Sequence, residues 1–347
     1  MTYRNVVIIG GGAWGTALAI SLSQNLSVTL VIRSPQEVED IREKKENSRY
    51  LPGIRVPDSV CITSDLASVI PGADLVLIAA PVSAFESVVS AVAAIRKDIP
   101  VIWGCKGFCS VTGEPLSLLA EKILGKDACF GVLSGPSFAS GLAEQHPTAV
   151  VVATNSDKEK TLAIARALSN RCLRVYANSD LIGVQICGAI KNVYAIAAGI
   201  IDGSGWGENT RAAMLTRAVA EAKLYLKKHG SKRSTLMGLS GFGDLYLTCS
   251  SRLSRNYQIG MALASNVPLA DALEKIGHVV EGVSVTHLIR QRASVLDIEM
   301  PIVAAVSEVI NGNKTPHECV TMLMARDIKH EKRKRTAKLA KQHSDLP

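Results

Sequence analysis

One lysine lies in the middle of a long apolar stretch. Residues 181–201 are apolar around the whole circumference of a helix, and Lys191 and Asn192 stand at their centre. An ammonium group is costly to hold inside a protein, so such a lysine has to be paired, neutral or functional. The alternative is a lysine whose stem lies along apolar neighbours while its charge reaches solvent. A buried amine with a lowered pKa can exchange a proton with a substrate oxygen.

The same stretch is long enough for a membrane span, which takes about 20 apolar residues. Its details argue against one. A lysine at mid-span costs roughly 3 kcal/mol, and the flanking residues Asp180 and Asp202 are acidic rather than basic. We therefore predict a core helix and no membrane span.

Two further polar groups lie in the C-terminal half. Asp244 follows a glycine-rich turn, from which its carboxylate could reach Lys191 or cap a helix. Residues 250–256 combine serines, two arginines and an asparagine. This mixture binds phosphate through charge-assisted hydrogen bonds, and a solvated surface loop is the alternative.

The N-terminus carries the pattern of a dinucleotide-binding turn. An apolar strand over residues 6–9 precedes Gly10, Gly12 and Gly15, and a helix pattern follows. In this context the first glycine makes the turn, the second lets the backbone approach a pyrophosphate, and the third lets helix and strand pack closely. The helix N-terminus then holds the phosphates. A purely structural glycine turn is the alternative.

The residue after the second predicted strand bears on the choice of cofactor. Arg33 follows the strand at residues 27–32. A strictly NAD-selective site has Asp or Glu there, whereas an arginine can bind the 2′-phosphate of NADP. We therefore expect NADP(H) to be accepted at least as well as NAD(H). An ordinary exposed loop arginine is the alternative.

Further strand patterns alternate with helices before residue 178, at 73–83, 101–107, 130–139 and 148–154. This alternation predicts a Rossmann-type, doubly wound parallel sheet, whose ligands lie beyond the carboxyl ends of the strands. Lys106, Gly135 and Ser137 stand at such ends. Ser137 also begins a helix pattern, where its hydroxyl suits either an anion or a plain N-cap.

After residue 178 the pattern is helical. We predict an NAD(P)-binding α/β domain over 1–178, an all-α substrate and catalytic domain over 179–330, and a flexible basic tail over 331–347. The formal charge is +8, and residues 326–347 hold eight Lys and Arg against three Asp and Glu. A solvated tail is favoured over a nucleic-acid contact because no aromatic residues are interleaved with the charges.

The composition, 47% hydrophobic and 20% charged, is that of an ordinary globular protein. The eight cysteines show neither a CxxC pair nor histidines at zinc spacing, so we predict reduced core thiols and no metal. No signal-peptide pattern precedes the first strand, from which we expect a cytoplasmic protein. A homodimer is the default expectation for its assembly.

Together these segments closely resemble the bacterial NAD(P)-dependent glycerol-3-phosphate dehydrogenases. The most specific matches are Gly188-Ala-Ile-Lys-Asn-Val193, Gly241-Phe-Gly-Asp244 and Ser254-Arg-Asn256, and the resemblance ends at about Arg326. It implies reduction of dihydroxyacetone phosphate to sn-glycerol 3-phosphate by hydride transfer. Lys191 is then the catalytic general acid and base, and the product feeds glycerophospholipid synthesis.

The resemblance also implies the contacts with ligands. Substrate contacts fall on Lys106, Gly135, Ser137, Lys191, Asp244, Ser254, Arg255 and Asn256. Cofactor contacts fall on Ala13, Trp14, Arg33, Tyr50, Lys106, Ala139, Arg255, Val279 and Glu281, beside the glycines of the turn. The chain departs from the commoner family pattern by three glycines at 10–12 and by Val-Ile at 31–32.

Two other functions remain open from the sequence. One is a related two-domain reductase of a hydroxy acid or sugar acid, whose carboxylate substrate would not need the segment 250–256. The other is a nicotinamide-sensing protein that binds the cofactor without turnover and contacts DNA through its basic tail.

Overall fold

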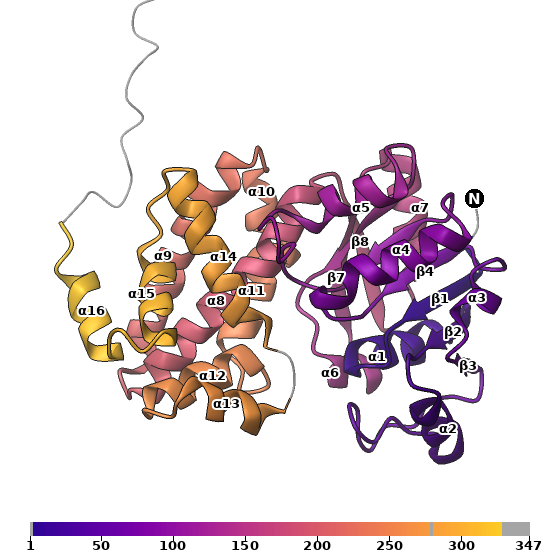
Figure 1. Cartoon of the computed structure of the whole chain (residues 1–347), viewed down its shortest axis with the longest axis horizontal. Helices are drawn as coiled ribbons and strands as arrows, with labels where there is room; N and C mark the ends of the chain where they lie inside the picture. Colours follow the sequence, from indigo (N-terminus) through magenta and orange to yellow (C-terminus); the bar gives the residue numbers. More distant parts are fainter. Residues whose placement is uncertain (1–2, 278–279, 328–347) are drawn as a thin grey trace, which may run out of the picture.

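The computed structural model describes residues 3–277 and 280–327. Within them one eight-stranded sheet, coloured indigo to magenta, lies beside a helical part coloured pink to yellow (Figure 1). The last strand ends at Asn178 and the next helix begins at Leu181. The predicted fold class, a Rossmann-type sheet followed by helices, is confirmed. The predicted basic tail at 331–347 lies outside the described residues.

The strands are short, and most of their residues are buried. They are β1 (Asn5–Ile9), β2 (Ser27–Val31), β3 (Val60–Thr63), β4 (Leu75–Ile78), β5 (Val101–Trp103), β6 (Phe130–Ser134), β7 (Thr148–Thr154) and β8 (Leu173–Asn178). Their order across the sheet is β3-β2-β1-β4-β5-β6-β7-β8. The order reverses between β1 and β4, and the carboxyl edge beside such a switch point is where open α/β sheets bind ligands.

One pair of strands departs from the expected parallel sheet. β7 runs antiparallel to β6, with Ser134 opposite Val151, whereas the other neighbouring pairs are parallel. The connection contains only the short helix α6 (Ala139–Ala143). A helix of this length rises only about 7 Å, too little to carry the chain back along the sheet for a parallel return.

Helices cover both faces of the sheet. Besides α6 they are α1 (Ala13–Leu22), α2 (Pro35–Lys44), α3 (Leu66–Val69), α4 (Phe85–Ile95), α5 (Leu116–Leu124), α7 (Lys158–Leu168) and the 3-10 turn η1 (Val82–Ala84). Alternate residues of β1 belong to different cores: Ile8 packs in a cluster with Leu18, and Val7 packs in a cluster with Phe85. This follows from the alternation of side chains along a strand.

The helical part is built around α8 (Leu181–Gly203), which is buried from Gly183 to Ile201. The other elements are α9 (Gly207–Lys228), α10 (Arg233–Leu236), the π-helical turn η2 (Leu239–Gly243), α11 (Asp244–Cys249), α12 (Arg255–Ala264), α13 (Leu269–Ile276), α14 (Glu281–Val295), α15 (Pro301–Ile310) and α16 (Pro316–Met324). Among the described helices α8 alone is long and apolar enough to cross a membrane, and its apolar window is 100% buried by protein.

The burial of α8 depends on glycines and on a capped start. A Cβ at Gly199 would lie 2.0 Å from the carbonyl oxygen of Tyr257, and one at Gly260 would lie 2.1 Å from that of Ile196, so α8 and α12 touch backbone to backbone. At the start of α8, Asp180 Oδ1 accepts from the Gly183 N–H at 2.9 Å. Asp180 Oδ2 accepts from Thr235 Oγ1 at 2.7 Å, which ties α8 to α10.

All eight cysteines are free thiols, as predicted. Five of them are buried, which agrees with the prediction that most are core thiols, and Cys61 on β3 is exposed. No group of three or more His, Cys, Asp or Glu side chains is placed to hold a metal ion within residues 3–277 and 280–327.

Candidate active site

Lys191 is buried in the helical part, with 7% of its surface exposed. Its Nζ donates to Asp244 Oδ1 at 2.6 Å and to Thr248 Oγ1 at 2.7 Å. The alternative of a lysine that reaches solvent is therefore wrong. Burial lowers the pKa of Lys191 from 10.5 to about 8, although the Asp244 carboxylate opposes this shift. The nearby Lys106 ammonium lowers the pKa further.

Asp244 joins two lysines that come from the two parts of the chain. Its Oδ2 accepts from the Nζ of Lys106, a residue that follows β5, at 2.6 Å. The same Nζ also donates to the Gly135 carbonyl oxygen at 3.2 Å. The Asp244 side chain is 1% exposed and that of Lys106 is 18% exposed. Two cations that share one carboxylate leave one net positive charge. Such a group is suited to stabilise negative charge that develops on a reacting oxygen.

The carboxylate is placed by an irregular start of its helix. The π-helical turn η2 precedes α11, and such turns are frequent at functional sites. The turn packs tightly because a Cβ at Gly241 would lie 2.1 Å from the carbonyl oxygen of Leu236. One turn into α11, Thr248 Oγ1 donates to the Asp244 carbonyl oxygen at 2.6 Å. Thr248 therefore accepts from Lys191 while it is held by the backbone of Asp244.

Gly135 and Ser137 extend this network on the sheet side. Ser137 Oγ donates to the Gly135 carbonyl oxygen at 3.0 Å, the same oxygen that accepts from Lys106. Helix α6 begins only at Ala139, after Phe138, and no side chain caps it. The expectation that Ser137 begins or caps this helix is therefore wrong.

Ser254, Arg255 and Asn256 form the start of α12. Ser254 caps the helix, because its Oγ accepts from the Tyr257 N–H at 3.3 Å. Asn256 Oδ1 accepts from the Gly282 N–H at 3.0 Å. Ser254 and Asn256 are buried while Arg255 is exposed. The alternative of a solvated surface loop therefore holds for residues 250–253 but not for Ser254 and Asn256.

Gly282 brings this turn close to the lysine. A Cβ at position 282 would lie 2.3 Å from Asn256 Oδ1 and 3.0 Å from the carbonyl oxygen of Asn192, the residue after Lys191. A side chain at position 282 would displace the Asn256 amide from its present position. The first turn of α12 and the middle of α8 are thus neighbours in space.

Glu281 presents a carboxylate to the same cations. Burial raises its pKa, and the positive charges of Arg255, Lys106 and Lys191 oppose that rise. Glu281 therefore lies within electrostatic range of three of the predicted substrate residues, although the resemblance assigned it to the cofactor. Val279, which was assigned with it, lies outside the described residues.

The glycine turn joins β1 to α1 at the switch point of the sheet. Gly10 has φ +126°, and a Cβ there would lie 2.7 Å from the Ala79 carbonyl carbon. A Cβ at Gly15 would lie 1.9 Å from the Gly10 carbonyl oxygen, which is the close strand-to-helix contact predicted for the third glycine. A Cβ at Gly12 would meet nothing within 4 Å, and no side chain caps α1 there. The helix N-terminus is therefore open to an anionic ligand.

Several of the other predicted cofactor residues belong to segments that pack near this turn. Asn47 Nδ2 donates to the Gly11 carbonyl oxygen at 2.7 Å, which ties the segment of Tyr50 to the glycines. The Arg49 guanidinium lies 5.1 Å from the centre of the Tyr50 ring. The predicted residues Ala13, Trp14 and Ala139 pack against one and the same core cluster. Arg33 is exposed after the end of β2.

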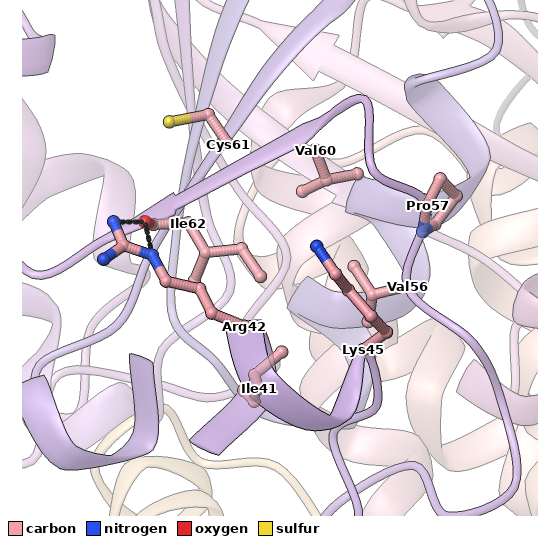
Figure 2. Close-up of a pocket in the computed structure, with 8 residues that line it drawn as sticks. All are labelled: Ile41, Arg42, Lys45, Val56, Pro57, Val60, Cys61 and Ile62. Atoms are coloured by element: carbon pink, nitrogen blue, oxygen red, sulfur yellow. Dashed lines mark hydrogen bonds between the residues drawn. The ribbon is translucent and has the colours of Figure 1, made fainter. Parts of the chain in front are cut away.

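A hollow of about 230 Å³ lies elsewhere, between α2 and β3 (Figure 2). It is lined by Ile41, Arg42, Lys45, Val56, Pro57, Val60, Cys61 and Ile62. The Nη2 of Arg42 donates to the Ile62 carbonyl oxygen at 2.6 Å. The Nζ of Lys45 forms an ion pair with Asp58 Oδ1 at 2.8 Å. Both cations thus have partners, and none of the lining residues is a predicted site residue. We therefore place the candidate site at Lys191 and Asp244.

Two family models match the chain. The model described as "NAD-dependent glycerol-3-phosphate dehydrogenase N-terminus" matches residues 5–160, and its C-terminal counterpart matches residues 180–321. The chain belongs to the NAD-dependent glycerol-3-phosphate dehydrogenase family. It is accordingly an NAD(P)-dependent oxidoreductase that acts on a CH–OH group.

Glycerol-3-phosphate dehydrogenases of bacteria are similar to the chain over nearly their whole length. The chain is 44% identical to glycerol-3-phosphate dehydrogenase [NAD(P)+] of Dechloromonas aromatica over 94% of its own length and 99% of that protein. It is 42% identical to the enzyme of the same name from Aromatoleum aromaticum, over 94% of its own length and 99% of that protein. The crystal structure of glycerol-3-phosphate dehydrogenase from Coxiella burnetii is similar with a TM-score of 0.88 at 34% identity, over 93% of this chain and 99% of that one.

Sequence reasoning missed two polar residues of this glycerol-3-phosphate dehydrogenase site. Thr248 stands four positions after Asp244 in an apolar run, and that spacing on a helix was the available signal. Asn47, which holds the segment of Tyr50 against the glycine turn, gave no signal because its partners Gly11 and Thr16 lie far away in the chain.

Proposed function

We propose that this family member reduces dihydroxyacetone phosphate to sn-glycerol 3-phosphate with NADPH or NADH. One observation carries the proposal. A buried lysine with a lowered pKa shares the carboxylate of Asp244 with Lys106, and Gly282 joins its helix to the turn at Ser254–Asn256. A carbonyl-activating group and a phosphate-binding turn thus lie beside each other.

Reduction of a ketone places negative charge on its oxygen, so a proton donor has to be directed at that oxygen. When bound, the nicotinamide supplies the hydride. Lys191, with a pKa of about 8, is largely protonated near neutral pH and can still release its proton. Asp244 orients the ammonium and offsets part of the effect of burial, while Lys106 adds a second positive charge.

The phosphate of the substrate would bind at the start of α12. The free N–H groups of a helix N-terminus attract an anion, and Arg255 adds a full charge with a planar set of donors. Asn256 uses its Oδ1 for Gly282, so its amide group is oriented with the Nδ2 available as a donor. Binding of the phosphate would align the reacting carbon with Lys191.

The pyrophosphate of the dinucleotide would bind at the glycine turn between β1 and α1. The open position over Gly12 and the uncapped start of α1 fit a pyrophosphate, and the exposed Arg33 fits the 2′-phosphate of NADP. We therefore propose residues 1–178 as the cofactor-binding domain and 179–330 as the catalytic domain. We also propose a cytoplasmic homodimer whose product feeds glycerophospholipid synthesis.

Nicotinamide absorbance tests the proposal directly. The purified full chain is mixed with NADPH or with NADH and one of three ketones: dihydroxyacetone phosphate, dihydroxyacetone, or a 2-keto acid without phosphate. We expect turnover to be fastest with dihydroxyacetone phosphate. Preference for the keto acid would support the hydroxy-acid reductase instead. Tight cofactor binding without turnover of any ketone would contradict an enzyme of this kind.

A further inference from the structure

Asp202, the penultimate residue of α8, joins three helices. Its Oδ2 accepts from Tyr257 Oη of α12 at 2.5 Å and also from Arg211 Nη1 of α9. The Tyr257 residue is 5% exposed, and the Asp202 side chain is 14% exposed. A carboxylate oxygen that accepts from both a cation and a hydroxyl makes strong, directional hydrogen bonds. This one atom therefore ties α9 and α12 to the end of α8.

The same helix carries the catalytic amine. Asp202 and Lys191 are about three helical turns apart, which places them on nearly the same face of α8 with about 16 Å between their backbone positions. Tyr257 lies in the first turn of α12, where its own N–H donates to Ser254 Oγ and its neighbours are Arg255 and Asn256. The Tyr257–Asp202 bond thus ties the proposed phosphate-binding turn to the C-terminal end of the helix that carries the proposed proton donor.

The tyrosine bond adds to the backbone contacts between α8 and α12 and to the Asn256–Gly282 hydrogen bond. At Gly199 and Gly260 the two backbones touch, which sets how closely the helices approach. Such contacts are van der Waals in kind and have little directional preference. A hydrogen bond prefers near-linear geometry, so the Tyr257–Asp202 bond adds an angular constraint.

We propose that Tyr257 is a positioning residue for the reaction. Through Asp202 it holds the first turn of α12 at the orientation in which Arg255 and Asn256 place a phosphorylated ketone against Lys191. Arg211 keeps the Asp202 carboxylate paired, so that it remains a strong acceptor for the tyrosine. The inference rests on the proposed function, because it assumes that the substrate phosphate binds at this turn.

The test is Tyr257→Phe, which removes one hydroxyl and keeps the ring. Tyr194→Phe is the matched control, because Tyr194 is a buried tyrosine of α8 whose hydroxyl has no hydrogen-bond partner among the described residues. We measure kcat and KM for dihydroxyacetone phosphate, for dihydroxyacetone, which lacks the phosphate, and for NADPH. We expect Tyr257→Phe to lower kcat/KM for dihydroxyacetone phosphate by about tenfold, the usual effect of one charge-assisted hydrogen bond. The values for dihydroxyacetone and NADPH stay within about twofold, as does every value in Tyr194→Phe.

A role in overall stability alone would lower turnover of both ketones equally, and that result overturns the inference. Unchanged kinetics with the phosphorylated ketone overturn it as well.

Combining Tyr257→Phe with Asp202→Asn tests the pair. Two residues that act through one bond show a loss of kcat/KM in the double variant that is smaller than the product of the two single losses. Fully independent losses count against the bond. A wild-type protein without activity on dihydroxyacetone phosphate overturns both this inference and the proposed function, whereas an active wild type with an unaffected Tyr257→Phe variant overturns the inference alone.

Discussion

Lys191 and Asp244 are separated by 53 positions in the chain, and their Nζ and Oδ1 atoms lie 2.6 Å apart. The carboxylate binds Lys106 with its other oxygen, so it is shared between the sheet and the helical part. Asp244 therefore joins the proposed proton donor of the helical part to a lysine that follows the sheet strand β5.

Replacement of Lys191 tests the proton donor. Lys191→Ala is expected to lower kcat by roughly 10²–10⁴-fold, the usual contribution of a general acid. Lys191→Arg keeps the positive charge but does not release its proton, so we expect it to be almost as slow. NADPH binding, measured by fluorescence titration, is expected to survive in both variants. The exposed Lys158→Ala serves as a control, and near-normal turnover of Lys191→Ala would refute the role.

The rate of ketone reduction should fall as the pH rises through about 8, because Lys191 donates a proton and has a pKa of about 8. The oxidation of glycerol 3-phosphate should rise over the same range, since it needs the neutral amine. The Asp244 carboxylate raises the pKa of Lys191, so Asp244→Asn should move both limbs to lower pH. Measurement of kcat against pH in both directions tests this, and a limb that moves to higher pH would contradict it.

Arg255 is expected to bind the substrate phosphate. Arg255→Ala removes a charged donor, so we expect KM for dihydroxyacetone phosphate to rise by about 10–100-fold. Arg252→Ala is the matched control, because it removes an exposed arginine from the same segment, and its KM should change little. If both variants have the same KM as the wild type, the phosphate binds elsewhere.

Glu221 should make the stability of the fold depend on pH. Its Oε1 accepts from the Ile302 N–H at 2.6 Å, while its buried Oε2 has no partner among the described residues. Burial raises the pKa of Glu221 from 4.5 to about 7, although the backbone N–H groups of Ile302 and Val303 oppose the rise. The folded state therefore binds this proton more tightly than the unfolded state does. The resulting stabilisation is complete below about pH 4.5 and is lost as the pH rises through about 7.

Glu221→Gln keeps an acceptor for Ile302 and does not titrate. We expect its Tm to depend less on pH between about 5 and 8 than that of the wild type, and to exceed the wild-type Tm at about pH 8 by several degrees. Thermal unfolding over this range measures the difference. Glu159→Gln, at an exposed position of α7, should reproduce the wild-type curve. A parallel shift of the whole Glu221→Gln curve would show that the carboxylate does not titrate in this range.

Local pattern was sufficient for the general architecture. The spacing of Gly10, Gly12 and Gly15 after an apolar strand and before a helix predicted the dinucleotide-binding turn, because this pattern can be recognised within one short stretch of chain. The apolar run around Lys191 predicted a buried helix, since periodicity reports how much of a helix surface is covered. The alternation of strands and helices predicted the sheet, though not the antiparallel β7, whose direction depends on a connection too short to return along the sheet.

The amino-acid sequence by itself determined a core helix with a lysine at its centre, after a dinucleotide-binding sheet, but left open whether the amine of that lysine is buried or reaches solvent. Only the tertiary structure decided that this amine binds Asp244 and Thr248, that Lys106 shares the carboxylate, and that Asn256 lies beside Asn192 through Gly282. Burial is encoded locally in residue types and their spacing. A hydrogen bond requires two atoms within about 3 Å, and for residues far apart in the chain that distance is set by how the helices and the sheet pack together.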